Sequence, residues 1–320
     1  MPDQSVPDTR LFQICVIVDD LERYAENWRT ILGFDVPSDV QVTREHAHTQ
    51  ATYRGRPMEA RGKIVSWPLG EIHFELLQPL DEGSVWMDFL RAHGPGLQHV
   101  ALLVPRIAPA AAVFADRGFR VTQQGLFTGR SGAYAYLSTE DSLGLALELL
   151  EHYEGGAWPT ARPFPEDRGL GTDRVTQVGL VVNDLDEAVR RYRETFDLPE
   201  PALAETPGRE VTEMTFHGEP SDATARLAFL DFGPVDVELI QPDREPSVWR
   251  QHLDRHGNSA QHLAFRVKDT GEVVDRLSKH GIGVLQQGLY GDRSGMYTYL
   301  DTQAALGVTL ELLESFPAPR

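Results

Sequence analysis

Two histidines stand inside apolar runs where a buried strand has no evident need for an imidazole. The run 97–104 reads Leu-Gln-His-Val-Ala-Leu-Leu-Val and carries His99. A related run, 260–267, carries His262, which lies 163 positions later. Short apolar runs behind a turn-like break predict buried strands. A single strand histidine is usually a hydrogen-bonded core residue, but its recurrence in similar company indicates a functional pair.

Strand alternation identifies further polar side chains on the faces that carry these histidines. Successive side chains of a strand point to opposite faces, so Glu75 lies with His73 and Leu77, opposite the apolar set at 72, 74 and 76. Glu148 likewise interrupts an otherwise apolar strand. Each half offers four such residues on its inner strands: Gln13, Glu75, His99 and Glu148, then Gln177, Glu238, His262 and Glu311.

One imidazole and three oxygen donors in each half predict a metal site. A buried carboxylate without a partner is costly, so each glutamate needs a cation or a hydrogen-bond donor. The donor set suits a divalent ion such as Zn, Ni, Co, Mn or Fe(II). The alternative is a buried hydrogen-bonded network in which glutamine and histidine bridge the carboxylates. Recurrence of the full set in both halves favours the metal.

Three other residues are candidates for contact with a substrate. Arg130 and Arg293 stand in repeated Arg-Ser-Gly turns, where an arginine could clamp a carboxylate or a phosphate. The alternative for both is a solvated turn. His73 shares the face of Glu75, but its counterpart is Asp236, so we expect a substrate-facing or structural role rather than metal ligation.

Residues without a matching partner in the other half are weaker candidates. Cys15 is matched by Gly179, which argues against a catalytic thiol. His46 and His48 have no matching histidines, so surface or substrate-contacting roles are expected. These differences also mean that the two sites need not be equally active.

The chain is one unit repeated twice. Residues 75–151 align with 238–314 without a gap, and the strand at Gln13 aligns with the strand at Gln177. The segment between the halves is rich in proline and glycine, which is typical of a linker. We therefore predict one domain over 1–152, a linker over 153–172 and a second domain over 173–320.

Each half in turn reads as two βαβββ modules. In the first, a strand at 11–18 is followed by a helix at 21–32, for which Asp20 is an N-cap, and by strand-like runs near 49–54, 63–67 and 71–78. The second module follows a short helix at 84–93, which we expect Trp86 to anchor, as Trp249 does in the other half. The sequence thus predicts an α+β fold whose four modules, 11–80, 97–151, 175–242 and 260–314, pair into two domains with curled mixed sheets around a cleft.

Composition excludes several classes of partner. With 41% hydrophobic and 24% charged residues, the 320-residue chain has a globular composition. Its net charge of -18 argues against binding nucleic acid. No apolar run approaches the ~20 residues of a membrane span. One cysteine and a polar start without an export signal lead us to expect a cytoplasmic monomer or homodimer that binds a small molecule.

The motifs resemble those of the vicinal oxygen chelate superfamily, which includes glyoxalase I, methylmalonyl-CoA epimerase, type I extradiol dioxygenases and bleomycin-resistance proteins. They are Gln-x-x-x-x-Val-x-Asp-Leu from Gln13, Gln-His-x-Ala-x-x-Val from Gln98 and Leu-Gly-x-x-Leu-Glu-Leu-Leu-Glu from Leu143. These fall where that family places its metal ligands, and the resemblance covers nearly the whole chain. The connector 84–96 is most similar to the epimerases, whereas the order Gln then Glu resembles eukaryotic glyoxalase I.

The resemblance implies a metal-dependent enzyme acting on a carbonyl-containing small molecule. The metal would bind vicinal substrate oxygens as a Lewis acid, while a glutamate removes the proton α to the carbonyl to give an enediolate. This chemistry fits an epimerase, an isomerase or a glyoxalase-type lyase. The catalytic glutamates would be Glu75, Glu148, Glu238 and Glu311.

Alternatives of other classes remain. One is a metal-free binding or resistance protein of the bleomycin-resistance type, and another is a tailoring enzyme of secondary metabolism with a larger substrate. Extradiol dioxygenases are disfavoured, because their iron needs two histidines and a carboxylate, whereas each site here has one histidine. We expect the ligands to pair within a half, because the linker composition marks a boundary between units and connected elements tend to be neighbours.

Overall fold

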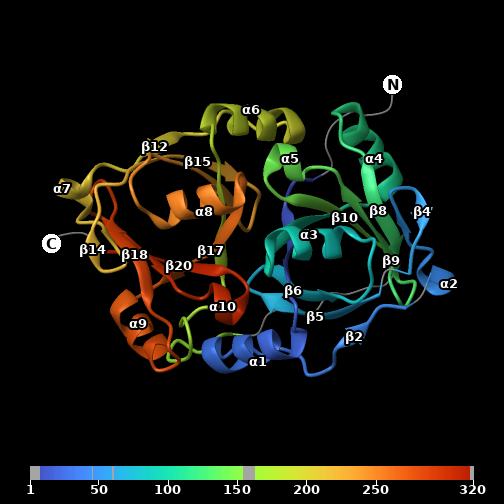
Figure 1. Ribbon diagram of the computed structural model, residues 1–320, viewed down its shortest axis with the longest axis horizontal. Coiled ribbons are helices and arrows are strands. Elements are labelled where there is room, and N and C mark those ends of the chain that lie inside the picture. The colour runs from blue at the N-terminus through green and yellow to red at the C-terminus, as the bar shows by residue number, and fades with distance from the viewer. Residues whose placement is uncertain (1–7, 45, 60, 154–162, 318–320) are drawn as a thin grey trace.

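The structure, a computed structural model, describes residues 8–44, 46–59, 61–153 and 163–317. It contains two ten-stranded mixed sheets, one in each half of the chain, and each sheet curls with its helices around it (Figure 1). This arrangement confirms the predicted α+β fold with two curled mixed sheets.

The two sheets have the same strand order. In spatial order, the first sheet comprises β2 (Gln41–Val42), β5 (Gly62–Leu69), β6 (Ile72–Pro79), β1 (Leu11–Ile17), β7 (Gly96–Leu103), β10 (Ala146–His152), β9 (Gly132–Leu137), β8 (Val121–Leu126), β3 (Thr52–Tyr53) and β4 (Arg56–Pro57). The second comprises β12 (Leu203–Glu205), β15 (Ala225–Asp231), β16 (Asp236–Pro242), β11 (Val175–Val181), β17 (Ser259–Val267), β20 (Thr309–Ser315), β19 (Gly295–Leu300), β18 (Val284–Leu289), β13 (Thr215–Phe216) and β14 (Glu219–Pro220).

Helices connect these strands at the places that the capping residues predict. Asp20 accepts a hydrogen bond from the backbone of Arg23 at the start of α1, and Ser84 does the same for Met87 at the start of α3. The helices are α1 (Leu21–Leu32), α2 (His46–Thr49), α3 (Val85–His93), α4 (Ile107–Asp116), α5 (Glu140–Leu143), α6 (Leu185–Phe196), α7 (Arg209–Thr212), α8 (Val248–His256), α9 (Thr270–Ser278) and α10 (Gln303–Leu306).

The modules of one half pair with each other through their first strands. β1 runs antiparallel to β7, and β11 runs antiparallel to β17. Outside this central pair, β6 lies parallel to β1 and β10 lies parallel to β7. The strand pairings of each sheet stay within one half of the chain, as we predict from the linker.

One predicted strand lies elsewhere than expected. The run near 49–54 should belong to the first module, but its strand is only β3, and β3 pairs with β8 of the second module. The edge of the first module is instead the two-residue strand β2. Ala51 is fully buried against the cleft-side residues. This tertiary packing holds the segment across the cleft, and the local sequence does not predict it.

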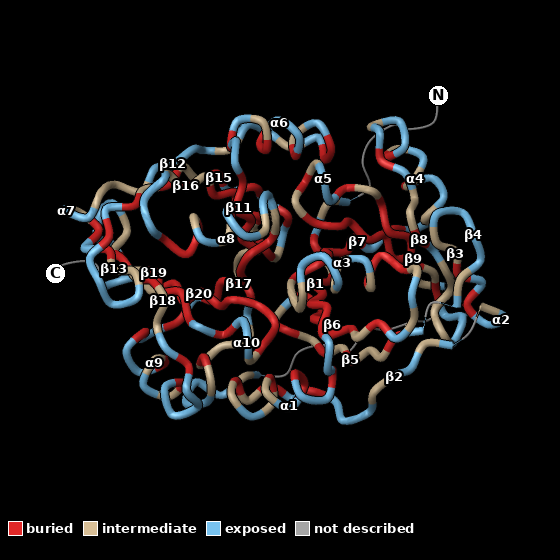
Figure 2. Tube along the Cα trace, in the orientation of Figure 1, coloured by how far each residue is buried: buried red, intermediate tan, exposed pale blue. Residues whose placement is uncertain are grey.

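The two faces of each sheet have different cores, as strand alternation predicts. Ile72, Phe74 and Leu76 face the helices, whereas Leu77 packs on the other face with cleft-side residues. The helix-side core is continuous between the two halves, and Figure 2 shows its buried strands extending across the molecule. The halves therefore share one apolar core in addition to their separate clefts.

Two equivalent buried hydrogen bonds join the halves. The indole of Trp28 on α1 donates to the backbone oxygen of Leu306 on α10 at 2.9 Å. Tyr192, which occupies the place of Trp28 in the second half, donates to the oxygen of Leu143 on α5 at 2.8 Å. α1 lies beside α10, and α6 lies beside α5, at opposite sides of the molecule (Figure 1). The halves are thus related by an approximate two-fold arrangement.

Among the helices of the described residues, none combines the length and the apolar character needed to cross a lipid bilayer.

The contact between Tyr192 and Leu143 predicts the effect of a conservative substitution. Tyr192→Phe leaves a buried carbonyl oxygen without its donor, which costs about 1–3 kcal/mol. We expect the free energy of unfolding, measured by urea denaturation, to fall by that amount. Tyr153→Phe, at a side chain exposed to solvent, is the control and should change it by less than about 0.5 kcal/mol. Equal effects of the two substitutions would show that this hydrogen bond does not stabilise the fold.

Candidate metal centres and their clefts

The second half holds a compact cluster of one imidazole and two carboxylates. His262 on β17 lies with its Nε2 atom 3.4 Å from Glu238 on β16 and 3.2 Å from Glu311 on β20. All three side chains are buried, and His262 has no exposed surface. The three ligand atoms face the cleft side of the sheet and could hold a metal ion together. Strands far apart in the sequence thus bring together three of the four residues predicted for this site.

The first half holds a related cluster with a different third member. His99 Nε2 lies 3.3 Å from Glu148. Its other close neighbours are Glu75 and the thiol of Cys15, and one ligand atom from each of Cys15, Glu75 and His99 lies within 4.8 Å of the others. His99 therefore lies beside both predicted glutamates, Glu75 and Glu148, and a cysteine that the repeat pattern argued against lies with Glu75 and His99.

Gln13 and Gln177 lie beside these clusters. Gln13 is buried on β1, two residues before Cys15, and lines the same cavity as Glu75 and Glu148. Gln177 on β11 lines the corresponding cavity with Glu238 and Glu311. Both amides are therefore placed at the clusters, and their role as ligands stays a prediction.

A β-bulge in β7 and another in β17 orient the histidine side chains. Cys15 pairs with His99 and the next residue of β1 pairs with Leu97, so Gln98 is the additional residue of the bulge. Gln261 occupies the same place between Ala260 and His262. The extra residue puts each glutamine next to its histidine on one side of the strand, which alternation alone does not predict.

The glutamine at each β-bulge contacts Nδ1, the imidazole nitrogen that faces away from the cluster. His99 Nδ1 lies 2.5 Å from Oε1 of Gln98, and His262 Nδ1 lies 3.1 Å from Oε1 of Gln261. Because an amide oxygen only accepts, Nδ1 must carry the proton, and in the neutral ring Nε2 presents a lone pair. This is the arrangement of a metal-binding histidine whose second nitrogen is fixed by a hydrogen bond. Sequence reasoning missed this role, although the repeated Gln-His pair signalled it.

The atoms that face one another in each cluster lack hydrogen-bond partners in the described chain. They are buried, and they are Nε2 of His99 and His262 together with Oε2 of Glu148, Glu238 and Glu311. Ligand bonds of about 2.1 Å put neighbouring ligand atoms about 3.0–3.4 Å apart in octahedral or tetrahedral geometry. The observed separations of 3.2–3.4 Å agree with that spacing. The residues therefore fit a divalent metal ion better than a satisfied hydrogen-bonded network.

Without a cation, the clusters hold protons more tightly than ordinary side chains. Burial raises the pKa of Glu75 to about 7, and the charge of Glu148 acts in the same direction. Burial also raises the pKa of Glu238. For His262, burial opposes the charged form, but Glu311 and Glu238 together raise its pKa to about 9. Burial also raises the pKa of the Cys15 thiol.

Aromatic side chains form the walls of both clefts. The first cleft has a volume of about 440 Å³ and contains Trp86, Tyr134 and Tyr136. The second has about 330 Å³ and contains the equivalent Trp249, Tyr297 and Tyr299. Tyr136 and Tyr299 meet His99 and His262 edge to face, with ring centroids 5.0 and 5.1 Å apart. The two tryptophans are buried in the first turns of α3 and α8, and Trp249 donates to Tyr299 at 2.9 Å. Their role as anchors of these helices stays a prediction.

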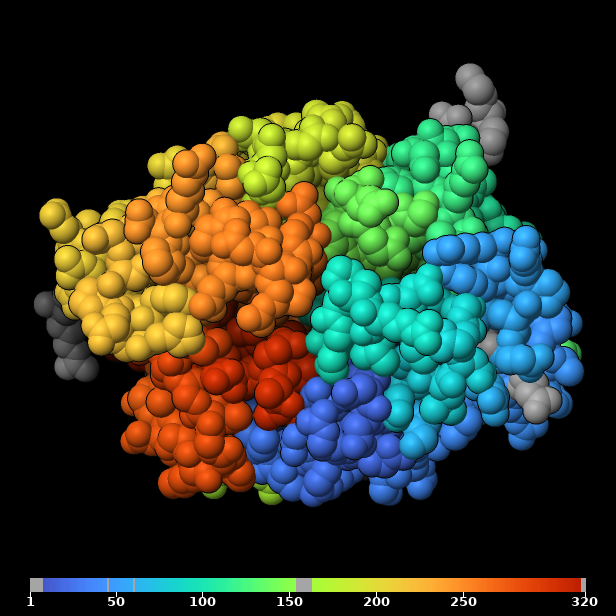
Figure 3. All heavy atoms as spheres, in the orientation of Figure 1, coloured from blue at the N-terminus to red at the C-terminus, as the bar shows by residue number. Residues whose placement is uncertain are grey.

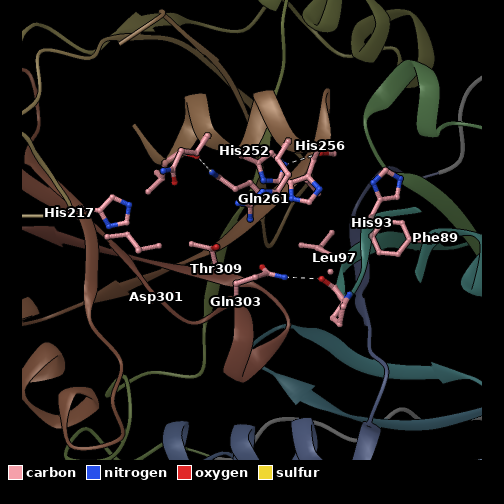
Figure 4. A pocket seen from close by; sticks show the side chains of 18 residues that line it. Phe89, His93, Leu97, His217, His252, His256, Gln261, Asp301, Gln303 and Thr309 are labelled. Carbon is pink, nitrogen blue, oxygen red and sulfur yellow. Dashed lines mark hydrogen bonds between the residues drawn. The ribbon is translucent and has the colours of Figure 1, made fainter. Parts of the chain in front are cut away.

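A further cavity lies at neither cluster. It measures about 560 Å³ and opens between the halves, where Figure 3 shows the face hollowed at the meeting of α8, α10 and α3. The imidazoles of His93, His252 and His256 lie together in it (Figure 4). Burial lowers the pKa of His252 to about 3 and also lowers that of His256, so both are uncharged near neutral pH. Gln261 also lines this cavity, so the cavity lies behind the second cluster.

The three predicted substrate contacts have other neighbours in the structure. Arg130 donates to the backbone oxygen of His48, and Arg293 donates to that of Val211 and pairs with Glu213. Both arginines therefore attach their loops to α2 and α7. His73 stacks on Phe12 with ring centroids 5.1 Å apart. None of the three is among the residues that line the clefts, and their contact with a substrate stays a prediction.

Comparison with known proteins gives the family and the fold. The family model of the Glyoxalase/Bleomycin resistance protein/Dioxygenase superfamily matches residues 12–136 and 176–299. No curated protein sequence matches the chain significantly.

Among solved structures, a mutant of 4-hydroxymandelate synthase from Streptomyces coelicolor is 16% identical, with a TM-score of 0.63, and the match covers 98% of this chain and 95% of that one. A halotolerant catechol dioxygenase is 12% identical, with a TM-score of 0.51, and the match covers 98% and 88%. Methylmalonyl-CoA epimerase from Mycobacterium tuberculosis is 25% identical over 45% of this chain and 89% of its own, with a TM-score of 0.34.

The geometry predicts the metal content of the protein. We expect up to two divalent ions per chain, because both clusters present partnerless ligand atoms. His99→Ala and His262→Ala should each remove one ion, whereas the exposed His280→Ala should remove none. Elemental analysis of protein purified without chelator, and again after reconstitution with zinc, measures this. Wild-type protein that takes up no ion would exclude the metal centres.

The raised pKa values predict how the metal-free protein responds to pH. A group that holds its proton more tightly when folded stabilises the fold at low pH and loses that contribution as pH rises through its folded pKa. For Glu75 this window runs from 4.5 to about 7, and for His262 from 6.5 to about 9. The melting temperature with chelator should therefore fall as pH rises from 6.5 to about 9, and a bound ion should suppress the fall. Below pH 6.5 the lowered pKa of His252 acts in the opposite direction. A metal-free protein whose melting temperature rises over this range would contradict the assignment.

Proposed function

Because the chain belongs to the Glyoxalase/Bleomycin resistance protein/Dioxygenase superfamily, we propose that it is a metal-dependent enzyme that moves a proton α to a carbonyl of a small molecule. The superfamily includes metal-dependent isomerases, epimerases and dioxygenases. An epimerase, an isomerase or a glyoxalase-type lyase would use the same first step.

The observation that carries the proposal is the pair of carboxylates at His262. Glu238 and Glu311 come from β16 and β20, which flank the central strands β11 and β17, and each reaches the same imidazole nitrogen. His262, Glu238 and Glu311, with Gln177 beside them, would hold a divalent ion in this half. His99, Glu75, Glu148 and Gln13 would do so in the other.

The glutamates provide the acid–base chemistry. A carboxylate can remove a proton from carbon, and its protonated form can return the proton. One glutamate would take the proton from carbon and the opposite glutamate would return it, either to the other face or to a neighbouring carbon. A bound divalent ion supplies Lewis-acid polarisation of the substrate's oxygens.

The walls of the clefts favour a substrate with an apolar part. Trp249, Tyr297 and Phe229 line the second cleft beside the cluster, so a polar carbonyl head at the glutamates would place an alkyl or aromatic group against these rings. A cleft of about 330–440 Å³ suits a small molecule. A larger substrate of the secondary-metabolism kind would have to extend out of the cleft.

The other readings are supported less well. A dioxygenase with a facial triad needs two imidazoles at its iron, and each cluster formed by the described residues contains one. A metal-free binding protein would have no use for carboxylates that are buried without hydrogen-bond partners, because their desolvation is costly. That reading nevertheless predicts a distinct outcome in the following experiment.

The test is solvent deuterium exchange. The zinc- and manganese-loaded proteins are incubated in D₂O with α-hydroxy ketones, hemithioacetals of α-ketoaldehydes and 2-branched acyl thioesters, and NMR follows loss of the α-proton signal. We expect exchange with one of these classes. In a His99→Ala background, which removes the first site, we expect Glu238→Gln or Glu311→Gln to slow exchange by about 10²–10⁴-fold. Glu272→Gln, on the exposed face of α9, is the matched control and should exchange at the wild-type rate.

Tight binding of a compound by the metal-free protein, without exchange or turnover by the loaded protein, would replace the proposal with the binding-protein alternative.

A further inference from the structure

The two clusters differ at one position that lies between the carboxylate and the imidazole. In the first half, Cys15 pairs with Glu75 on one side and with His99 on the other. In the second half, Gly179 pairs with Glu238 and with His262. Strand register therefore puts a thiol at the centre of one cluster and no side chain at the centre of the other.

Gly179 is what lets His262 reach both carboxylates. A Cβ atom at Gly179 would lie 1.8 Å from Cε1 and 2.2 Å from Nε2 of His262, so the ring occupies the volume of the missing side chain. From there Nε2 approaches Glu238 and Glu311 at 3.4 and 3.2 Å. Any residue other than glycine would exclude this position of the ring.

Cys15 imposes a different arrangement on the first cluster. With a side chain at this position, His99 cannot lie where His262 lies, and its ion-pair contact in the described chain is with Glu148 alone. The Cys15 sulfur, one carboxylate oxygen of Glu75 and one ring nitrogen of His99 all lie within 4.8 Å of one another. The thiol thus lies with one carboxylate and the imidazole, whereas in the second half the imidazole lies with two carboxylates.

Two further atoms point to a ligand at this thiol. Nε2 of His99 and Oε2 of Glu148 are buried and lack hydrogen-bond partners in the described chain. Gln98 occupies the other ring nitrogen, so the lone pair of His99 is directed to the cluster. Cys15 therefore lies beside partnerless donor atoms of the cluster and is not an isolated cysteine.

We propose that Cys15 is a metal ligand and that the first cluster is a mixed sulfur, nitrogen and oxygen site, whereas the second is a nitrogen and oxygen site. The inference rests on the proposed function, because it requires that the clusters hold metal. On binding, the thiol proton leaves to solvent and the thiolate coordinates the ion. Thiolate favours zinc and cobalt over manganese, so the two sites of one chain differ in metal preference.

The test uses cobalt(II) as the probe in the full-length protein. Coordination by a thiolate produces a sulfur-to-cobalt charge-transfer band in the near ultraviolet, which nitrogen and oxygen ligands do not produce. Wild-type protein should show this band when the first or the second equivalent of cobalt(II) is added, depending on which site fills first. His262→Ala, which removes the second site, should retain it. Cys15→Ser should lose the band, and Cys15→Gly should lose it while still binding cobalt in the manner of the second half.

The outcomes separate the two proposals. Cobalt that binds at two equivalents without the band would overturn the role of Cys15 and leave the metal-dependent function standing. A wild-type protein that binds no cobalt would overturn both. The wild-type spectrum decides the role of Cys15 by itself, so the result does not depend on whether the variants fold.

Discussion

The cost of burying carboxylates beside an imidazole governs this structure. Each half places buried glutamates on strands that are rich in apolar side chains, and the oxygen and nitrogen atoms that face one another have no hydrogen-bond partner in the described chain. Such an arrangement is stable only if protons or a cation compensate the charge. In the metal-free protein, protons compensate the charge, as the raised pKa values of Glu75 and His262 indicate. In the metal-loaded protein, the divalent ion would do so.

Backbone geometry makes this cluster possible. The bulge at Gln98 and Gln261 places glutamine and histidine on one side of a strand, so the amide fixes the tautomer of the ring. Gln261 also donates to the backbone oxygen of Val248 at 2.9 Å, which connects the imidazole to the first turn of α8. The helix between the modules is therefore part of the support of the site as well as a connector.

The two halves are joined more closely than a linker between repeats requires. Their helix-side cores merge, and the hydrogen bonds of Trp28 and Tyr192 cross the junction at equivalent places. The clefts, by contrast, belong to separate sheets. Each cleft can therefore diverge in its chemistry while the common core keeps the architecture. The exchange of Cys15 for Gly179 is such a divergence, because one side chain changes how far the neighbouring histidine can reach.

The sequence by itself determined the repeat, the modules, the α+β fold and the four polar positions of each half, because strand alternation and recurrence are local properties of the chain. It did not determine the crossing of β3 to β8 or the bulge at the histidines, because both depend on contacts between distant strands. In the alignment of the two halves, Cys15 corresponds to Gly179, and this mismatch argued against a catalytic role for the thiol. Only the tertiary structure placed its sulfur between Glu75 and His99, because register across three strands decides which side chains share one volume.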